Sequence, residues 1–153
     1  MDRTFLITSV TAQRRTLFQG TDAADLVVDV FLSYRNQCKY LLHEFVIMPD
    51  HFHALITPAF EISLERAVQF IKGGFSFRLK SSLPVWQPSF TNHRIRDDED
   101  FARHREYIQM NPVRAGLVGR AEEYPYSSAT GKFALDAMPP GLKPPNIWRR
   151  TPA

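Results

Sequence analysis

The chain has 153 residues, of which 44% are hydrophobic, so it is long enough for one domain with a substantial core. A lone cysteine, Cys38, excludes an internal disulfide and a cysteine-based zinc site, and no apolar run reaches the length of a membrane span. Residues 66–120 carry ten Lys and Arg against five Asp and Glu; this stretch is therefore +5 within a chain of net charge +3, which leaves −2 for the rest. A basic middle points to a polyanionic partner. The first residues do not form a signal peptide, so we expect a cytoplasmic protein.

The first half of the chain shows a strand, a polar loop, a helix and two strands in succession: residues 3–10, 11–20, 21–38, 40–48 and 52–57. Thr21 or Asp22 is expected to cap the helix. Pro49-Asp50 separates the last two strands by a tight turn, which predicts a β-hairpin with the segment after Asp50 at its tip.

The second half predicts a helix capped by Ser63, a loop, a strand, a helix opening on four acids, and a proline-rich tail: residues 64–79, 81–88, 89–95, 97–110 and 121–153. Gly73-Gly74 either kinks the first of these helices or admits a close neighbour. Asn111-Pro112 is expected to end the last helix and to start a short turn that stops near Gly116. The order βαββαβ followed by a helix predicts an α+β fold with a ferredoxin-like, split βαβ antiparallel sheet.

His51 and His53 flank Phe52 within the third predicted strand. Side chains alternate along a strand, so both imidazoles point to one face while Phe52 points to the other. Roughly 6–7 Å apart at the backbone, the two imidazoles can share one metal ion, although two ligands rarely make a site alone. A chance pair on a solvated strand face is the simpler alternative.

Tyr107 and Asn111 are separated by four residues and therefore share one face if both lie on one helix. A phenol and an amide oxygen would then approach the same point. Each residue also has an ordinary interpretation, Tyr107 as a half-buried aromatic and Asn111 as a helix cap.

Five blocks of this sequence resemble the HUH tyrosine transposases of the Y1, IS200-like type, specifically the REP-associated tyrosine transposases. The blocks stand in the family's order and cover residues 3 to about 130: 48–56, 70–76, 86–90 with 93–96, 107–118 and 124–129. The most specific are MPDHFHALI at 48–56 and YIQMNPVRAGLV at 107–118. Asn92 departs from the pattern, because the family usually has Asp before His93.

The resemblance implies a catalytic domain at residues 1–130 and a separate tail at 131–153. It also implies that His51, His53 and Asn111 hold a divalent metal, Mg²⁺ or Mn²⁺, and that Tyr107 is the nucleophile. The implied activity is cleavage and strand transfer of single-stranded DNA through a 5′-phosphotyrosine, without ATP. This fits the absence of a Walker-type glycine loop.

The implied partner is single-stranded DNA carrying a REP-like hairpin, bound by a monomer or a homodimer near the nucleoid. The phosphate contacts we expect are cations of the basic middle: Arg66, Lys72, Arg78, Lys80, Arg94, Arg96 and Arg114. Recognition of a defined hairpin sequence also requires contacts to base edges, for which Trp148, Arg149 and Arg150 of the tail are candidates.

Two other classes of function remain open at this point. One is a nucleic-acid binder without catalysis, either of the RRM type, which shares the βαββαβ order, or a domesticated hairpin-binding transposase. The other is a metal hydrolase that uses water, with Tyr107 uninvolved. A covalent protein–DNA adduct distinguishes the first interpretation from both.

Overall fold

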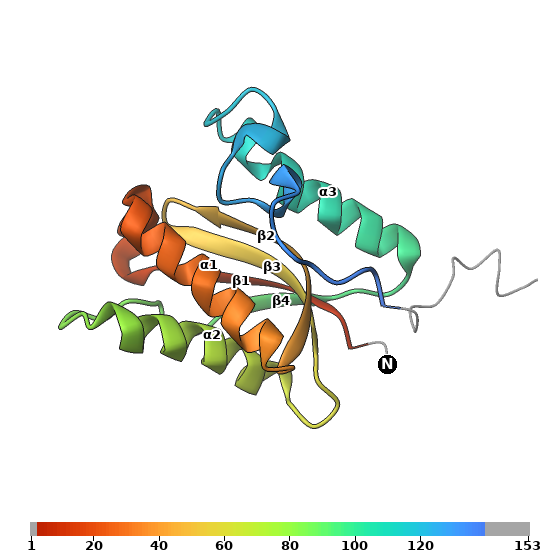
Figure 1. The fold of residues 1–153 in the computed structure, drawn as a ribbon, viewed down its shortest axis with the longest axis horizontal. Helices are drawn as coiled ribbons and strands as arrows, with labels where there is room; N and C mark the ends of the chain where they lie inside the picture. Colours follow the sequence, from red (N-terminus) through yellow and green to blue (C-terminus); the bar gives the residue numbers. More distant parts are fainter. Residues whose placement is uncertain (1–2, 140–153) are drawn as a thin grey trace, which may run out of the picture.

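A computed structural model describes residues 3–139 of the chain as a four-stranded antiparallel sheet with three helices (Figure 1). The strands are β1 (Phe5–Val10), β2 (Tyr40–Met48), β3 (His51–Pro58) and β4 (Thr91–Arg94), in the order β2-β3-β1-β4. The helices are α1 (Thr21–Asn36), α2 (Leu64–Leu79) and α3 (Asp98–Arg114). The predicted split βαβ arrangement is confirmed, since β3 lies between β1 and β2 and is antiparallel to both.

Each face of the sheet has its own core (Figure 1). α1 and α2 cover one face, where the ring of Phe52 meets that of Phe31 edge-on with centroids 5.0 Å apart. α3 covers the other face, where Ile108 packs with Val46 and Leu55. Because Phe52 is fully buried on the first face, His51 and His53 lie on the second, beneath α3.

The N-cap of α1 differs from the prediction, and that of α2 agrees with it. α1 begins after Gly20, which occupies the N-cap position in an extended conformation, so neither Thr21 nor Asp22 is the cap. The capping role of Ser63 in α2 is confirmed, because its Oγ accepts a hydrogen bond from Arg66 N at 3.0 Å.

The prediction that Asn111-Pro112 restarts the chain is wrong. α3 continues through both residues to Arg114 and ends where Gly116 adopts a left-handed φ of 76°. A proline inside a helix removes one backbone hydrogen bond, but Pro112 stands in the last turn and is buried, so packing offsets the loss. The unbroken helix keeps Tyr107 and Asn111 on one face.

The segment after α3 lies along the outer edge of β2. Tyr126 O accepts a hydrogen bond from Ile47 N at 2.9 Å, and Ser128 Oγ accepts from Phe45 N at 3.0 Å. Asp136 accepts from Leu42 N at 2.8 Å and forms an ion pair with Arg35 at 3.0 Å. The part of the predicted tail at 131–139 therefore contacts the sheet. The boundary at residue 130 stays a prediction.

Residues 140–153, with Trp148, Arg149 and Arg150, lie outside the described residues.

The glycine pair of α2 does not kink the helix. A Cβ at Gly74 would lie 2.8 Å from Tyr34 Cε2 of α1, whereas one at Gly73 would meet nothing closer than Gln69 Nε2 at 3.5 Å. The close approach of α1 and α2 therefore requires glycine at position 74 but not at position 73.

This difference makes the two glycines a matched pair. Gly73→Ala should raise the free energy of unfolding by about 0.5–1 kcal/mol, because alanine suits a helix interior better. Gly74→Ala should lower it by about 1–3 kcal/mol, because the Tyr34 ring must move. Urea denaturation of both variants measures this, and an equal gain from both would show that Tyr34 yields freely.

Candidate active site

The two imidazoles at the start of β3 form the centre of the site. Their ring centroids are 4.9 Å apart, and His53 is 6% exposed while His51 is half-buried. Across the sheet, His51 pairs with Val10 of β1 and Met48 of β2. The predicted common face of the two histidines is thereby confirmed.

A protein oxygen contacts Nδ1 of each imidazole. His51 Nδ1 donates to Asp50 Oδ1 at 2.7 Å, and Asp50 Oδ2 accepts from Arg14 Nη1 at 3.1 Å. Thr8 Oγ1 lies 2.7 Å from His53 Nδ1. Such contacts fix ring orientation and leave Nε2 of each imidazole as the nitrogen available to a metal, an arrangement typical of histidine ligands.

Burial sets the charge state of this centre. It lowers the pKa of His53 to about 3, with a smaller contribution from neighbouring His51, so His53 is neutral at physiological pH. Burial alone would raise the pKa of Asp50, but hydrogen bonds from His51 and Arg14 hold it below its usual value. Metal binding is favoured by the neutral imidazole of His53 and by the ionised carboxylate of Asp50, which accepts a hydrogen bond from His51.

Tyr107 reaches this centre from α3. Its ring meets that of His53 edge-on at 5.2 Å, yet it remains 41% exposed. Arg114 lies over the same ring, with Cζ 5.6 Å from the centroid. Asn111 follows Tyr107 by one turn and is half-buried, so its place beside the imidazoles rests on helical register alone.

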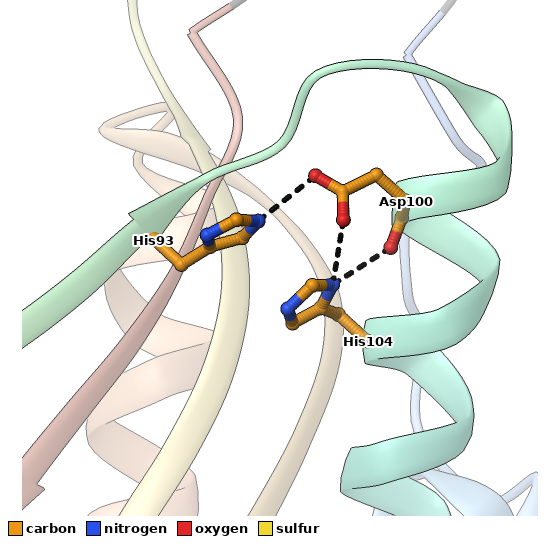
Figure 2. A group of neighbouring side chains, drawn as sticks. All are labelled: His93, Asp100 and His104. Carbon is orange, nitrogen blue, oxygen red and sulfur yellow. Dashed lines mark hydrogen bonds and ion pairs between the residues drawn. The ribbon is translucent and has the colours of Figure 1, made fainter. Parts of the chain in front are cut away.

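Asp100 anchors the beginning of α3 to β4 (Figure 2). Its carboxylate is 1% exposed and accepts from His93 Nε2 at 2.9 Å, Arg96 N at 3.0 Å and Arg103 Nη2 at 2.9 Å. His104 Nδ1 donates to the Asp100 carbonyl at 2.8 Å and stacks on His93, with centroids 4.3 Å apart. The sequence analysis expected the acids at 97–100 only to open a helix, where the dipole favours them, and it missed this cluster.

His93, Asp100 and His104 offer potential ligand atoms within 4.8 Å of one another, but their arrangement does not suit a metal. The two rings are nearly parallel, at 17°, so their in-plane lone pairs do not converge on one point. The hydrogen on His104 Nδ1 is committed to a carbonyl oxygen, and Arg103 already neutralises the carboxylate. We therefore assign this cluster to positioning α3.

The middle of α3 has a second anchor on β2. Gln109 Nε2 donates to Glu44 Oε1 at 3.2 Å, and Ser128 Oγ donates to the same oxygen at 2.6 Å. Tyr107 lies between Asp100 and Gln109 in the sequence, so the helix is anchored to the sheet on both sides of it.

The predicted phosphate contacts are not gathered in one place. Arg66, Arg78 and Lys80 are exposed on α2, which lies on the other side of the sheet from the imidazoles (Figure 1). Arg94 and Arg96 are exposed at the β4 end of the sheet, and Arg96 Nε lies 3.6 Å from Asp100. Arg114 is the candidate that lies beside Tyr107.

Lys72 has a structural partner. Its Nζ donates to the carbonyls of Gln87 and Ser89 at 3.0 and 3.2 Å. The Lys72 carbonyl in turn accepts a hydrogen bond from Trp86 Nε1 at 3.0 Å. Burial lowers the pKa of this lysine. These bonds tie the loop before β4 to α2, and β4 begins at Thr91 rather than at the predicted residue 89.

Comparison with known proteins places these features in context. A protein-family model for IS200-like transposases matches residues 4–111. The REP-associated tyrosine transposase of Escherichia coli (strain K12) is 31% identical over 113 residues, covering 69% of this chain and 67% of that protein. A Haemophilus influenzae protein described as the same type is 31% identical over 121 residues, covering 68% of this chain and 69% of its own length.

A solved structure of a REP-associated tyrosine transposase bound to a REP hairpin has the same fold. The TM-score is 0.74 at 24% sequence identity, with 93% of this chain and 88% of that chain covered. Among residues 3–139, no helix is long and apolar enough to span a membrane.

Replacing Asp50 tests the contact behind His51. Asp50→Asn keeps an acceptor for His51 Nδ1 but removes the charge, so Mn²⁺ affinity measured by isothermal titration calorimetry should fall about 10- to 100-fold. Asp29→Asn, an exposed carboxylate on α1, is the control and should bind Mn²⁺ like the wild type. Unchanged affinity in Asp50→Asn would show that this carboxylate does not support a metal ligand.

The Asp100 cluster predicts a pH dependence of stability. Burial would raise the pKa of Asp100, but hydrogen bonds from His93 and Arg96 lower it to about 2, from 3.8 when unfolded. A depressed folded pKa stabilises the protein above the unfolded value, by about 2 kcal/mol, and this stabilisation is lost as the pH falls from about 4 to about 2.

Asp100→Asn should therefore be less stable than the wild type at pH 7, and the difference should narrow towards pH 2. Asp98→Asn, which loses only an interaction with the helix dipole, should cost about 0.3–1 kcal/mol. Denaturant unfolding across this pH range measures both variants, and a pH-independent difference would contradict the role given to the carboxylate charge.

Proposed function

Since this chain belongs to the IS200-like transposase family, with the REP-associated tyrosine transposases as its relatives, we propose that it cleaves and rejoins single-stranded DNA at REP-like hairpins. The single observation that carries this proposal is the contact between Tyr107 and His53 at 5.2 Å. It brings a phenol to a pair of imidazoles whose Nδ1 atoms are already engaged by the protein.

His51 and His53 would hold the metal through Nε2, with Asn111 as third ligand. Two imidazoles and one amide oxygen leave coordination positions for phosphate and water, which suits Mg²⁺ or Mn²⁺. When bound, such an ion supplies Lewis-acid stabilisation of the charge that develops on the phosphate.

Tyr107 would perform the covalent step. Its Oη attacks the phosphorus, the bond from phosphorus to the 3′ oxygen breaks, and a 5′-phosphotyrosine and a 3′-hydroxyl result. The phenol loses one proton and the 3′ oxygen gains one. The reverse attack by another 3′-hydroxyl rejoins DNA without ATP, because the phosphodiester is conserved in the tyrosine ester.

The contacts that support this role lie within one chain. Tyr107 reaches His53 of the same chain, so cis use of the nucleophile needs no second copy. Arg114 would contact the scissile phosphate, which its position over the Tyr107 ring supports. Hairpin recognition is suggested by the REP hairpin in the structural relative, with Arg66, Arg78, Lys80, Arg94 and Arg96 as further phosphate contacts and Lys72 as a weaker candidate.

Tyr107→Phe tests the proposal, because it removes one oxygen and leaves the ring contact with His53. With a labelled single-stranded hairpin substrate and Mn²⁺, cleavage and the denaturation-resistant adduct should vanish together, while hairpin binding persists. Tyr126→Phe is the control, since Tyr126 is half-buried near Asp25 and away from the imidazoles. It should retain both activities.

Other outcomes identify other functions. Cleavage without an adduct in the wild type would indicate a hydrolase that uses water. Binding without cleavage in the wild type would indicate a domesticated hairpin-binding protein. An adduct in folded Tyr107→Phe would mean that another tyrosine is the nucleophile. Tyr40 and Tyr124 are poorly suited to that role, since their hydroxyls donate to Phe31 O and Ile47 O.

A further inference from the structure

Two hollows lie along α2 on the side that faces α1. Both helices are on the opposite side of the sheet from α3 and the imidazoles (Figure 1). One hollow of about 450 Å³ is lined by Lys39, Phe60, Arg66 and Phe70, among others. A second of about 380 Å³ is lined by Tyr34, Phe70, Phe77 and Arg78, among others. Phe70 lines both hollows, so they adjoin each other, and together they are called the α1–α2 groove.

The spacing of residues in α2 generates this groove. Arg66, Phe70, Gly73 and Phe77 follow one another at i, i+4, i+7 and i+11, which places them along one flank of the helix over about 16 Å. The lack of a side chain at Gly73 keeps the floor open between Phe70 and Phe77. Lys72 lies on the other flank, where it ties down the loop before β4.

Two of the aromatic side chains have no packing role that explains them. Phe60 is 93% exposed and Phe77 is 81% exposed. Phe70, between them, is fixed as a platform: Tyr34 stacks on it at 5.1 Å, and the cations of Lys39 and Arg66 lie 5.3 and 5.2 Å from its centroid. Exposed aromatics gathered along a groove mark a binding surface.

The charges along the groove select the kind of ligand. Lys39, Arg66 and Arg78 alternate with the rings, while Glu61 lies at the Phe60 end and Asp29 beyond Arg78. Rings interleaved with cations match the bases and phosphates of an unpaired strand, because bases stack on aromatics while phosphates pair with Lys and Arg. In a paired stem the bases stack on one another, so they present no free face to the aromatic side chains.

We propose that the α1–α2 groove binds unpaired DNA, as a contact separate from the catalytic face. Phe60 and Phe77 stack on bases, and Lys39, Arg66 and Arg78 contact phosphates. The Phe70 ring is already covered by Tyr34, Lys39 and Arg66, and it positions those two cations. The proposal rests on the proposed function only in taking DNA as the substrate. It adds a second surface that holds single strand next to a hairpin without taking part in cleavage.

The test measures binding in the full-length Tyr107→Phe protein, so that loss of cleavage cannot affect the result. The probe is a fluorescently labelled oligothymidylate, which has no secondary structure, and the readout is anisotropy. Phe60→Ala and Phe77→Ala should each weaken binding by about 5- to 100-fold, the usual range for one stacked base. Phe77→Trp, unlike Phe77→Ala, should bind the oligothymidylate with the affinity of the parent protein, because a larger ring stacks at least as well.

Two controls separate stacking from general effects. Leu83→Ala removes another exposed apolar side chain, outside the groove, and should leave the affinity unchanged. Arg66→Gln should reduce the slope of log affinity against log salt by about 0.7, as expected for one phosphate contact on single-stranded nucleic acid. A hairpin without a single-stranded flank should bind all the ring variants equally.

Unchanged oligothymidylate binding in Phe60→Ala and Phe77→Ala would overturn the proposal. So would sedimentation velocity showing that the wild type self-associates and that these variants do not, because the groove would then be an interface between two copies. Failure of the wild type to form a covalent adduct would contradict the proposed chemistry but not this binding site.

Discussion

Burial of Phe52 determines where both imidazoles point. This residue is fully buried against Phe31 beneath α1, and strand geometry then places His51 and His53 on the opposite face. A register shift of one residue would bring the histidines into the apolar core and Phe52 under α3. Such a shift would cost free energy on both faces, because the imidazoles would lose their hydrogen-bond partners and Phe52 would lose its contact with Phe31. The core itself therefore enforces the geometry of the site.

The second half of the site depends on how α3 is fixed over that face. Asp100 ties the start of the helix to His93 of β4, and Glu44 of β2 accepts from Gln109 further along. Tyr107 lies between these anchors while 41% of it remains exposed. The proposed nucleophile needs a defined position and access for its substrate, and an anchored helix that leaves the Tyr107 ring partly exposed supplies both.

Local signals were enough to predict the sheet, because β2 and β3 are buried on both faces and are correspondingly rich in apolar residues. Pro49-Asp50 also marks the turn between them. Periodicity also placed His51 and His53 on one face of a strand, and Tyr107 and Asn111 on one face of a helix. It failed at Asn111-Pro112, since that pair suits a helix start as well as a last turn, and burial of Pro112 decides between them. Long-range partners were also missed: nothing local to Asp100 indicates His93, and nothing local to Lys72 indicates the carbonyls of Gln87 and Ser89.

The C-terminal segment restricts how two copies could meet. β2 is an edge strand, and its outer backbone groups are engaged by Tyr126 O, Ser128 Oγ and the Asp136 carboxylate. An edge paired in this way cannot add a strand from a second molecule without first releasing these bonds. The opposite edge is β4, which has four residues and offers little to pair with. Since Tyr107 already reaches His53 of its own chain, the described part of the chain brings the proposed nucleophile and the imidazoles together without sheet extension.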